Sequence, residues 1–90
     1  MNNYYFSIIL NDICIFSSKN KELANEKLQT VKNAILSGKN VLTDNRYKVV
    51  SEVNKSDYIN IIFEGVNKFE LVYLSLHKRE LTDKQKNINF

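Results

Sequence analysis

Short apolar segments and polar breaks alternate over the first twenty residues. Residues 4–10 and 13–17 are rich in Ile, Phe and Tyr, and Asn11 and Asp12 separate them. Asn and Asp tolerate positive φ angles better than most residues, so this pair suits a two-residue type I′ turn. The pattern predicts a β-hairpin whose strands pair residue by residue from the turn outward, with apolar side chains on both faces.

The segment after the hairpin has helical periodicity. Its apolar positions recur every three or four residues, at Ala24, Leu28, Val31 and Ile35. This spacing predicts an amphipathic helix over about residues 20–37. Ser18 or Asn20 can cap its first turn, and Gly38 can adopt the left-handed conformation that ends a helix.

Apolar alternation returns in the second half of the chain. Three strands are predicted there, at 46–53, 58–64 and 68–78. Residues 54–57 are typical of a turn, and residues 65–67 of a three-residue hairpin loop. Such a loop would place Phe63 opposite Phe69, Ile61 opposite Leu71 and Ile59 opposite Tyr73.

The resulting order, β-β-α-β-β-β, predicts an α+β fold in a single domain over residues 1–90. Short hairpin connections favour a mainly antiparallel five-stranded sheet with one helix packed on one face. Residues 79–90 are polar except at Leu81, Ile88 and Phe90, and form either a short helix or a frayed end.

This architecture separates the apolar residues into two sets. The set expected beneath the helix is Phe6, Ile8, Leu10, Ile13, Ile15, Val49, Ile59, Ile61, Phe63, Phe69, Leu71 and Tyr73. The set expected on the opposite face is Ile9, Cys14, Phe16, Val50, Ile62, Val72, Leu74 and Leu76.

One helix can cover only one face of a sheet, and large exposed apolar patches mark interaction sites. The second set therefore predicts a face that binds a protein, either a different protein or another copy of the chain as a homodimer. The alternative is that a strong twist, or the tail with its three apolar residues, covers that face.

Composition limits the remaining possibilities. Apolar residues make up 43% of the chain, which indicates a globular domain, and the net charge of +3 is mild. The N-terminal segment lacks the basic start of a secretory signal, and the sequence has no apolar run long enough to span a membrane, so we expect a cytoplasmic protein. Asn, Lys and Ile are abundant and Pro and Trp are absent, a bias that codon composition links to a low-GC source.

Candidate chemistry is sparse. Cys14 is the only thiol and His77 the only imidazole, and the predicted register gives no reason for them to meet. The candidates for a carboxylate pair are Glu52, Glu64 and Glu70, and we expect them on strands without a cleft between them. We expect no enzymatic activity, no cofactor and no metal site.

A second hypothesis is a weakly basic nucleic-acid-binding module. Its basic and imidazole residues would be Lys48, His77, Lys78 and Arg79, with Lys19, Lys21 and Lys39 near the helix ends. The favoured hypothesis remains a small non-enzymatic protein-binding domain. The low-GC composition, the single small domain and the lack of catalytic residues suit an accessory or inhibitory protein of a low-GC bacterium, phage or plasmid. It would act through the apolar sheet face or an edge strand.

Overall fold

The predicted order of helix and strands is confirmed. The computed structural model describes residues 4–37 and 46–80. Its elements are β1 Tyr4–Leu10, β2 Ile13–Ser18, α1 Lys21–Leu36, β3 Tyr47–Asn54, β4 Tyr58–Gly65 and β5 Leu71–Glu80. The proposed cap at Gly38, the basic residue Lys39 and the tail beyond residue 80 lie outside the described residues.

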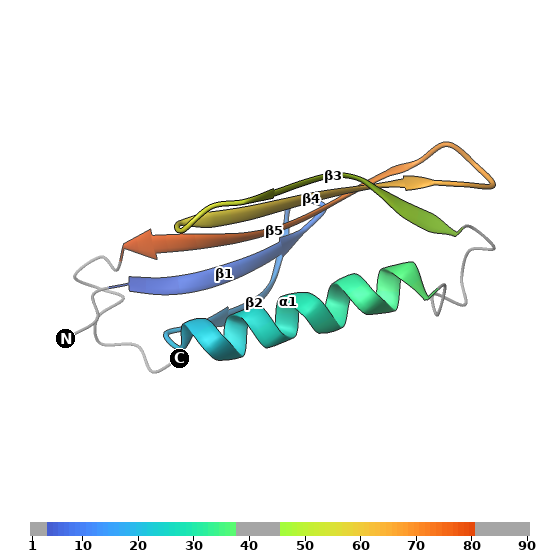
Figure 1. The fold of residues 1–90 in the computed structure, drawn as a ribbon. Coiled ribbons are helices and arrows are strands. Elements are labelled where there is room, and N and C mark those ends of the chain that lie inside the picture. Colours follow the sequence, from blue (N-terminus) through green and yellow to red (C-terminus); the bar gives the residue numbers. More distant parts are fainter. Residues whose placement is uncertain (1–3, 38–45, 81–90) are drawn as a thin grey trace.

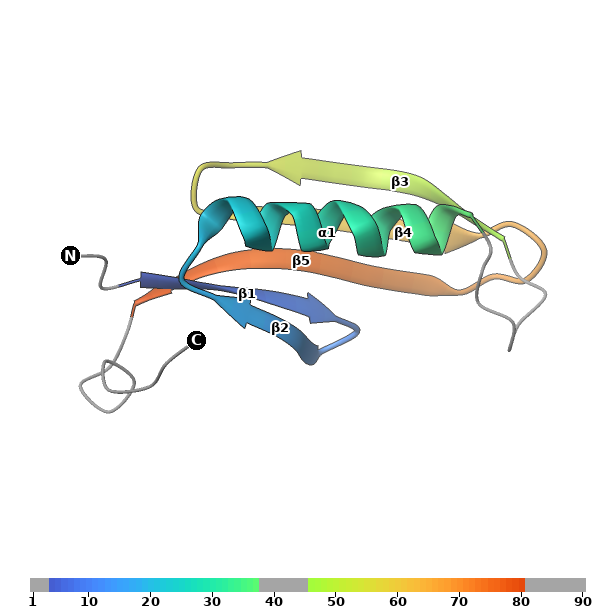
Figure 2. The same cartoon turned by 90° about the horizontal axis from the view of Figure 1, so that it is seen from below.

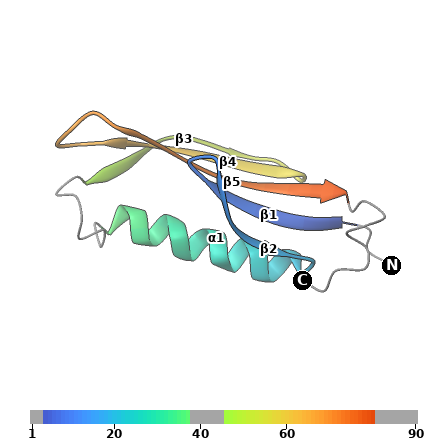
Figure 3. The same ribbon diagram turned by 180° about the vertical axis from the view of Figure 1, so that it is seen from behind.

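The five strands form one antiparallel sheet in the order β2-β1-β5-β4-β3. The last strand, β5, is therefore central, and β2 and β3 form the two edges. The helix α1 runs along one face of this sheet (Figures 1 and 3). In the view from the helix side, the β1–β2 hairpin lies to one side of α1 (Figure 2).

The turn between β1 and β2 has the backbone that the sequence predicts. Asn11 has φ 48° and Asp12 has φ 70°, the two positive values that a type I′ turn requires. Asn11 also joins this turn to the central strand. Its backbone N–H donates to the carbonyl oxygen of Tyr73 at 2.9 Å, and its Oδ1 accepts from the Tyr73 N–H at 2.9 Å.

A β-bulge changes the pairing of β1 with β2. Uninterrupted pairing would place Ile15 opposite Ile8, but the register shifts between Ile8 and Ile9, and Phe16 takes that position. The prediction for Phe16 is therefore wrong, because the extra residue moves its ring to the helix side, where it packs against the core. Ile13 and Ile15 are 66% and 39% exposed, since they lie on an edge strand beside the helix (Figure 2).

The loop between β4 and β5 is longer than predicted. The register pairs Phe63 with Val72 in place of Phe69, a shift of three residues. Because successive side chains of a strand alternate between faces, an odd shift exchanges the two faces of β5. Phe69 lies in the loop and is 74% exposed.

This exchange corrects the assignment of the whole strand. Val72, Leu74 and Leu76 are buried in the core that includes the helix, not on the opposite face. Leu71 and Tyr73 lie on the face away from the helix, although both were expected beneath it.

The core forms where the apolar stripe of α1 meets the sheet. Its buried members are Phe6, Ile8, Ala24, Leu28, Ile61, Phe63, Val72, Leu74 and Leu76. Val31 and Ile35 pack against this cluster, as the helical spacing predicts. The helix starts with Asn20 as its N-cap, whose Oδ1 accepts from the Leu23 N–H at 3.1 Å.

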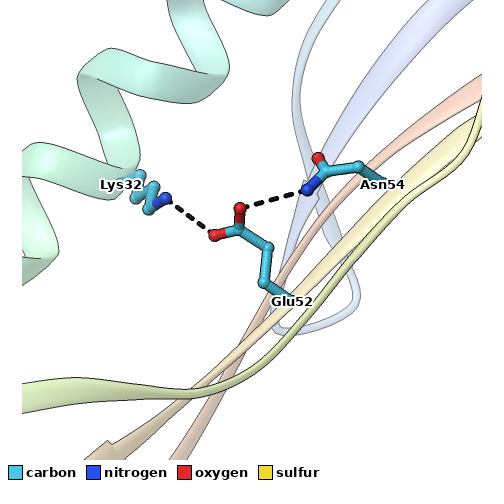
Figure 4. A network of polar contacts seen from close by, with 3 residues as sticks. All are labelled: Lys32, Glu52 and Asn54. Carbon is cyan, nitrogen blue, oxygen red and sulfur yellow. Dashed lines mark hydrogen bonds and ion pairs between the residues drawn. The ribbon is translucent and has the colours of Figure 1, made fainter.

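An ion pair ties α1 to the edge strand β3 (Figure 4). Lys32 Nζ lies 2.7 Å from Glu52 Oε1, and Asn54 Nδ2 donates to Glu52 Oε2 at 3.1 Å. The hydrogen bond from Lys32, followed by that from Asn54, lowers the pKa of the Glu52 carboxyl from its usual 4.5.

Leu28→Ala tests the core. Leu28 has no exposed surface, so truncation leaves a cavity and we expect a loss of about 2–5 kcal/mol in the free energy of unfolding. Denaturation with urea measures this loss, and Gln29→Ala on the exposed side of the helix is the control. A loss below about 1 kcal/mol would contradict the packing described.

Glycine substitutions at the two residues of the β1–β2 turn should have different effects on stability. Asp12→Gly removes the steric cost of a positive φ, so we expect the free energy of unfolding to rise by a few tenths to about 1 kcal/mol. Asn11→Gly relieves the same cost but removes the acceptor for the Tyr73 N–H, so it should be less stable than Asp12→Gly by about 1 kcal/mol. Equal effects in urea denaturation would show that the Asn11 side chain contributes nothing.

Glu52→Gln tests the ion pair through pH. A lowered carboxyl pKa in the folded state gives stability that is present above the unfolded value of 4.5 and is lost as the pH falls through the folded value. At pH 7 we expect the variant to be less stable by at most about 1 kcal/mol, because the pair lies at the surface. The difference from the native chain should shrink below pH 4.5, whereas Gln29→Ala, which changes no ionisable group, should show no such trend.

Candidate protein-binding face

The sheet face opposite α1 is called the open face here. Its members follow from the registers, because they alternate with the core residues on each strand. They are Tyr5, Ser7, Ile9, Cys14, Ser17, Lys48, Ser51, Val53, Tyr58, Asn60, Ile62, Glu64, Leu71, Tyr73, Ser75, His77 and Arg79. No described helix or strand covers this face (Figure 3).

Large side chains and small polar ones share the open face. Tyr73 is 50% exposed, and Tyr58, Leu71 and Val53 are each 37% exposed. The middle row of the face consists of neighbours on four strands, Ile9, Ser75, Asn60 and Val53. The middle is therefore free of charge.

Charged residues of the open face lie at its two ends. Lys48 and Glu64 are opposite each other at one end, and Arg79 lies near the other end of β5. The row of Glu64, at Leu71, is eight residue steps along β5 from Arg79, which corresponds to roughly 26 Å. The face thus has a neutral centre between charged ends.

A chain of polar contacts fixes one side of the open face. Ser7 Oγ lies 3.3 Å from Ser17 Oγ, and Cys14 Sγ lies 3.4 Å from the same hydroxyl. Cys14 Sγ also donates to the Phe16 carbonyl oxygen at 3.6 Å. These contacts satisfy the hydroxyl of Ser7, which is only 4% exposed.

His77 stacks on Tyr58 with ring centroids 6.5 Å apart and an interplanar angle of 18°. Burial, and then the charge of Arg79, lower the pKa of the His77 imidazole below its usual 6.5. The neutral form of His77 is therefore favoured at pH 7, as suits a face whose centre carries no charge.

The eight predicted binding residues divide into two groups. Ile9, Cys14 and Ile62 lie on the open face, and Val50 lies at a bulge of β3 with 47% of its surface exposed. The other four are on the helix side, namely Phe16, Val72, Leu74 and Leu76. The open face is consequently less apolar than the sequence suggested.

Tyrosines and serines of the open face were missed as binding candidates. Residues 72, 74 and 76 are all aliphatic, whereas the residues that follow each of them, Tyr73, Ser75 and His77, are aromatic or polar. This alternation indicates which side of β5 faces a core, independently of the loop length. This alternation could have placed Tyr73, Ser75 and His77 on the open face from the sequence alone.

The basic residues of the second hypothesis do not form one patch. Lys48 is at the opposite end of the sheet from the other three. Lys78 lies on the reverse face from His77 and Arg79, with its Nζ 4.2 Å from the centroid of the Tyr4 ring and 3.9 Å from Asp57 Oδ1. His77, Lys78 and Arg79 are consecutive in the sequence, but successive side chains of a strand point to opposite faces, so the three do not form one patch.

Other candidate chemistry is also dispersed. Cys14 pairs with Ile9, and His77 pairs with Ser7, so the thiol and the imidazole belong to different rows. Among the described residues, no three His, Cys, Asp or Glu side chains gather as a metal site. The described helix is also too short and polar to cross a membrane.

A cleft of about 90 Å³ lies on the helix side. It is lined by the start of α1, the β3–β4 turn and the adjoining sheet, through Phe6, Lys21, Asn25, Lys55, Ser56, Asp57, Tyr58, Ile59 and Leu76. Its volume is well below that of typical small-molecule sites.

Comparison of the chain with models of protein families, with curated proteins and with solved structures gives no match.

Proposed function

We propose that this chain is a non-enzymatic protein-binding domain that acts through its open face. The observation that supports the proposal is a sheet face that no described helix or strand covers, with a charge-free centre on which Tyr73 is 50% exposed. The chain could act as an accessory or inhibitory protein simply by covering a surface of its partner with this face.

The residue types of the open face are those of protein interfaces. Interface centres are depleted of charge and enriched in aromatic residues. Tyrosine provides a large contact area with little conformational entropy to lose, and Ser and Asn provide adaptable hydrogen bonds. Tyr58 and Tyr73 would contribute the first property, and Ser75 and Asn60 the second.

Both edge strands are less suited to binding than the open face. The register of β2 with its neighbour shifts beside Ile15, and that of β3 shifts beside Val50. A bulge interrupts the regular row of backbone groups that an added strand needs, which is one way in which proteins protect sheet edges. This argument favours the face over strand addition.

Tyr73→Asp provides the test. We expect the native chain, immobilised and exposed to a lysate of its host, to retain a protein equally well at about 0.1 M and about 0.5 M salt, because apolar contacts are not screened. Tyr73→Asp should reduce the retained protein at least tenfold, since it places a charge in the interface centre.

Gln29→Asp, on the exposed side of α1, is the matched control and should behave as the native chain does. Circular dichroism confirms that both variants fold. Retention of nucleic acid that falls steeply with salt would instead support the second hypothesis, and retention unaffected by Tyr73→Asp would refute binding through the open face.

A further inference from the structure

The central strand places five side chains along the middle of the open face. They are Leu71, Tyr73, Ser75, His77 and Arg79, at every second position of β5. Ser75 is the midpoint of this series, and it is small. A large partner surface can therefore approach closest at Ser75.

The charges nearest to β5 at the two ends of this series have opposite signs, and Lys48 lies one strand farther from β5 than Glu64. Glu64, opposite Leu71 on β4, marks one end, and Arg79 marks the other. A surface that complements the open face must offer a positive charge opposite Glu64 and a negative charge opposite Arg79. A second open face, turned end to end, meets both requirements.

Two face-to-face arrangements of identical sheets have two-fold symmetry with their strands nearly aligned. If the strands run parallel, the axis follows the central strand and Arg79 lies over the Arg79 of the other copy, which is repulsive. If they run antiparallel, the axis passes over Ser75, and Arg79 of each copy approaches Glu64 of the other. Tyr73 then lies over the neutral ring of His77, and Lys48 stays at the rim.

The size of the open face is close to what a dimer needs. Five strands of about seven paired residues cover roughly 23 by 24 Å, or about 1,100 Å² for the two copies together. Specific interfaces usually bury about 1,200–2,000 Å² of accessible surface. The footprint is slightly below this range and slightly above the roughly 1,000 Å² expected of a biological interface, so weak association is expected.

We propose that the occupant of the open face is a second copy of this chain, packed face to face with antiparallel strands about a two-fold axis over Ser75. This inference rests on the proposed function and identifies its partner. The interface would be self-complementary, as in most homodimers.

Molecular mass at increasing concentration, from sedimentation equilibrium, tests the proposal. The native chain should change from monomer to dimer as its concentration rises. Arg79→Glu and Glu64→Arg should each weaken dimerisation about tenfold, because an exposed pair contributes modestly and symmetry counts it twice. The double variant, with both charges reversed, should recover native dimerisation.

The matched controls are Lys27→Glu and Glu26→Arg, which make the same changes of charge on the exposed side of α1 and should leave dimerisation unchanged. Thermal melting followed by circular dichroism checks that each variant is folded. Recovery by the double variant distinguishes a specific Arg79–Glu64 contact from a general effect of net charge.

A chain that stays monomeric at all concentrations would overturn the second copy as partner. If Tyr73→Asp still abolished retention of a host protein, the proposed function would survive that result. If Tyr73→Asp changed neither the molecular mass in solution nor the retention of a host protein, both proposals would fail. A dimer that the double reversal does not restore would overturn the antiparallel arrangement.

Discussion

The contact between α1 and the central strand decides the rest of this structure. Val72, Leu74 and Leu76 of β5 pack in the core with Ala24 and Leu28 of the helix. Because β5 pairs with both β1 and β4, the side that it turns toward the helix fixes the side that its neighbours turn as well. The composition of the open face is a direct consequence, since it consists of what these strands leave on the other side.

The sequence was informative where the controlling interactions are local. The 3.6-residue spacing of the helix and the Asn11-Asp12 turn depend on neighbours in the chain, and both were predicted correctly. Register depends on tertiary packing, and there the prediction failed. The three-residue loop assumed after β4 is locally acceptable, but it would have placed Tyr73 rather than Leu74 in the core.

The sequence predicted that a second sheet face exists, but half of the residues that it assigned to that face were wrong. The argument that one helix leaves one sheet face uncovered applies to the described residues, whereas half of the apolar side chains assigned to that face belong to the core. Burial of the aliphatic side chains of β5 is worth more than burial of Tyr73 or Ser75, because it leaves no polar group without water. Tyrosine and serine therefore remain at the surface, where their hydroxyl groups stay available.

The hydrogen bonds between Asn11 and Tyr73 connect residues that are 62 positions apart. They extend the pairing of β1 with β5, which joins the N-terminal hairpin to the three-stranded C-terminal segment. On a ribosome, β1 emerges early and must wait for β5 before it gains its second neighbour. Closure of the sheet is thus a late, long-range event of the kind that slows folding, and in the interval the unpaired edge of β1 is open to aggregation.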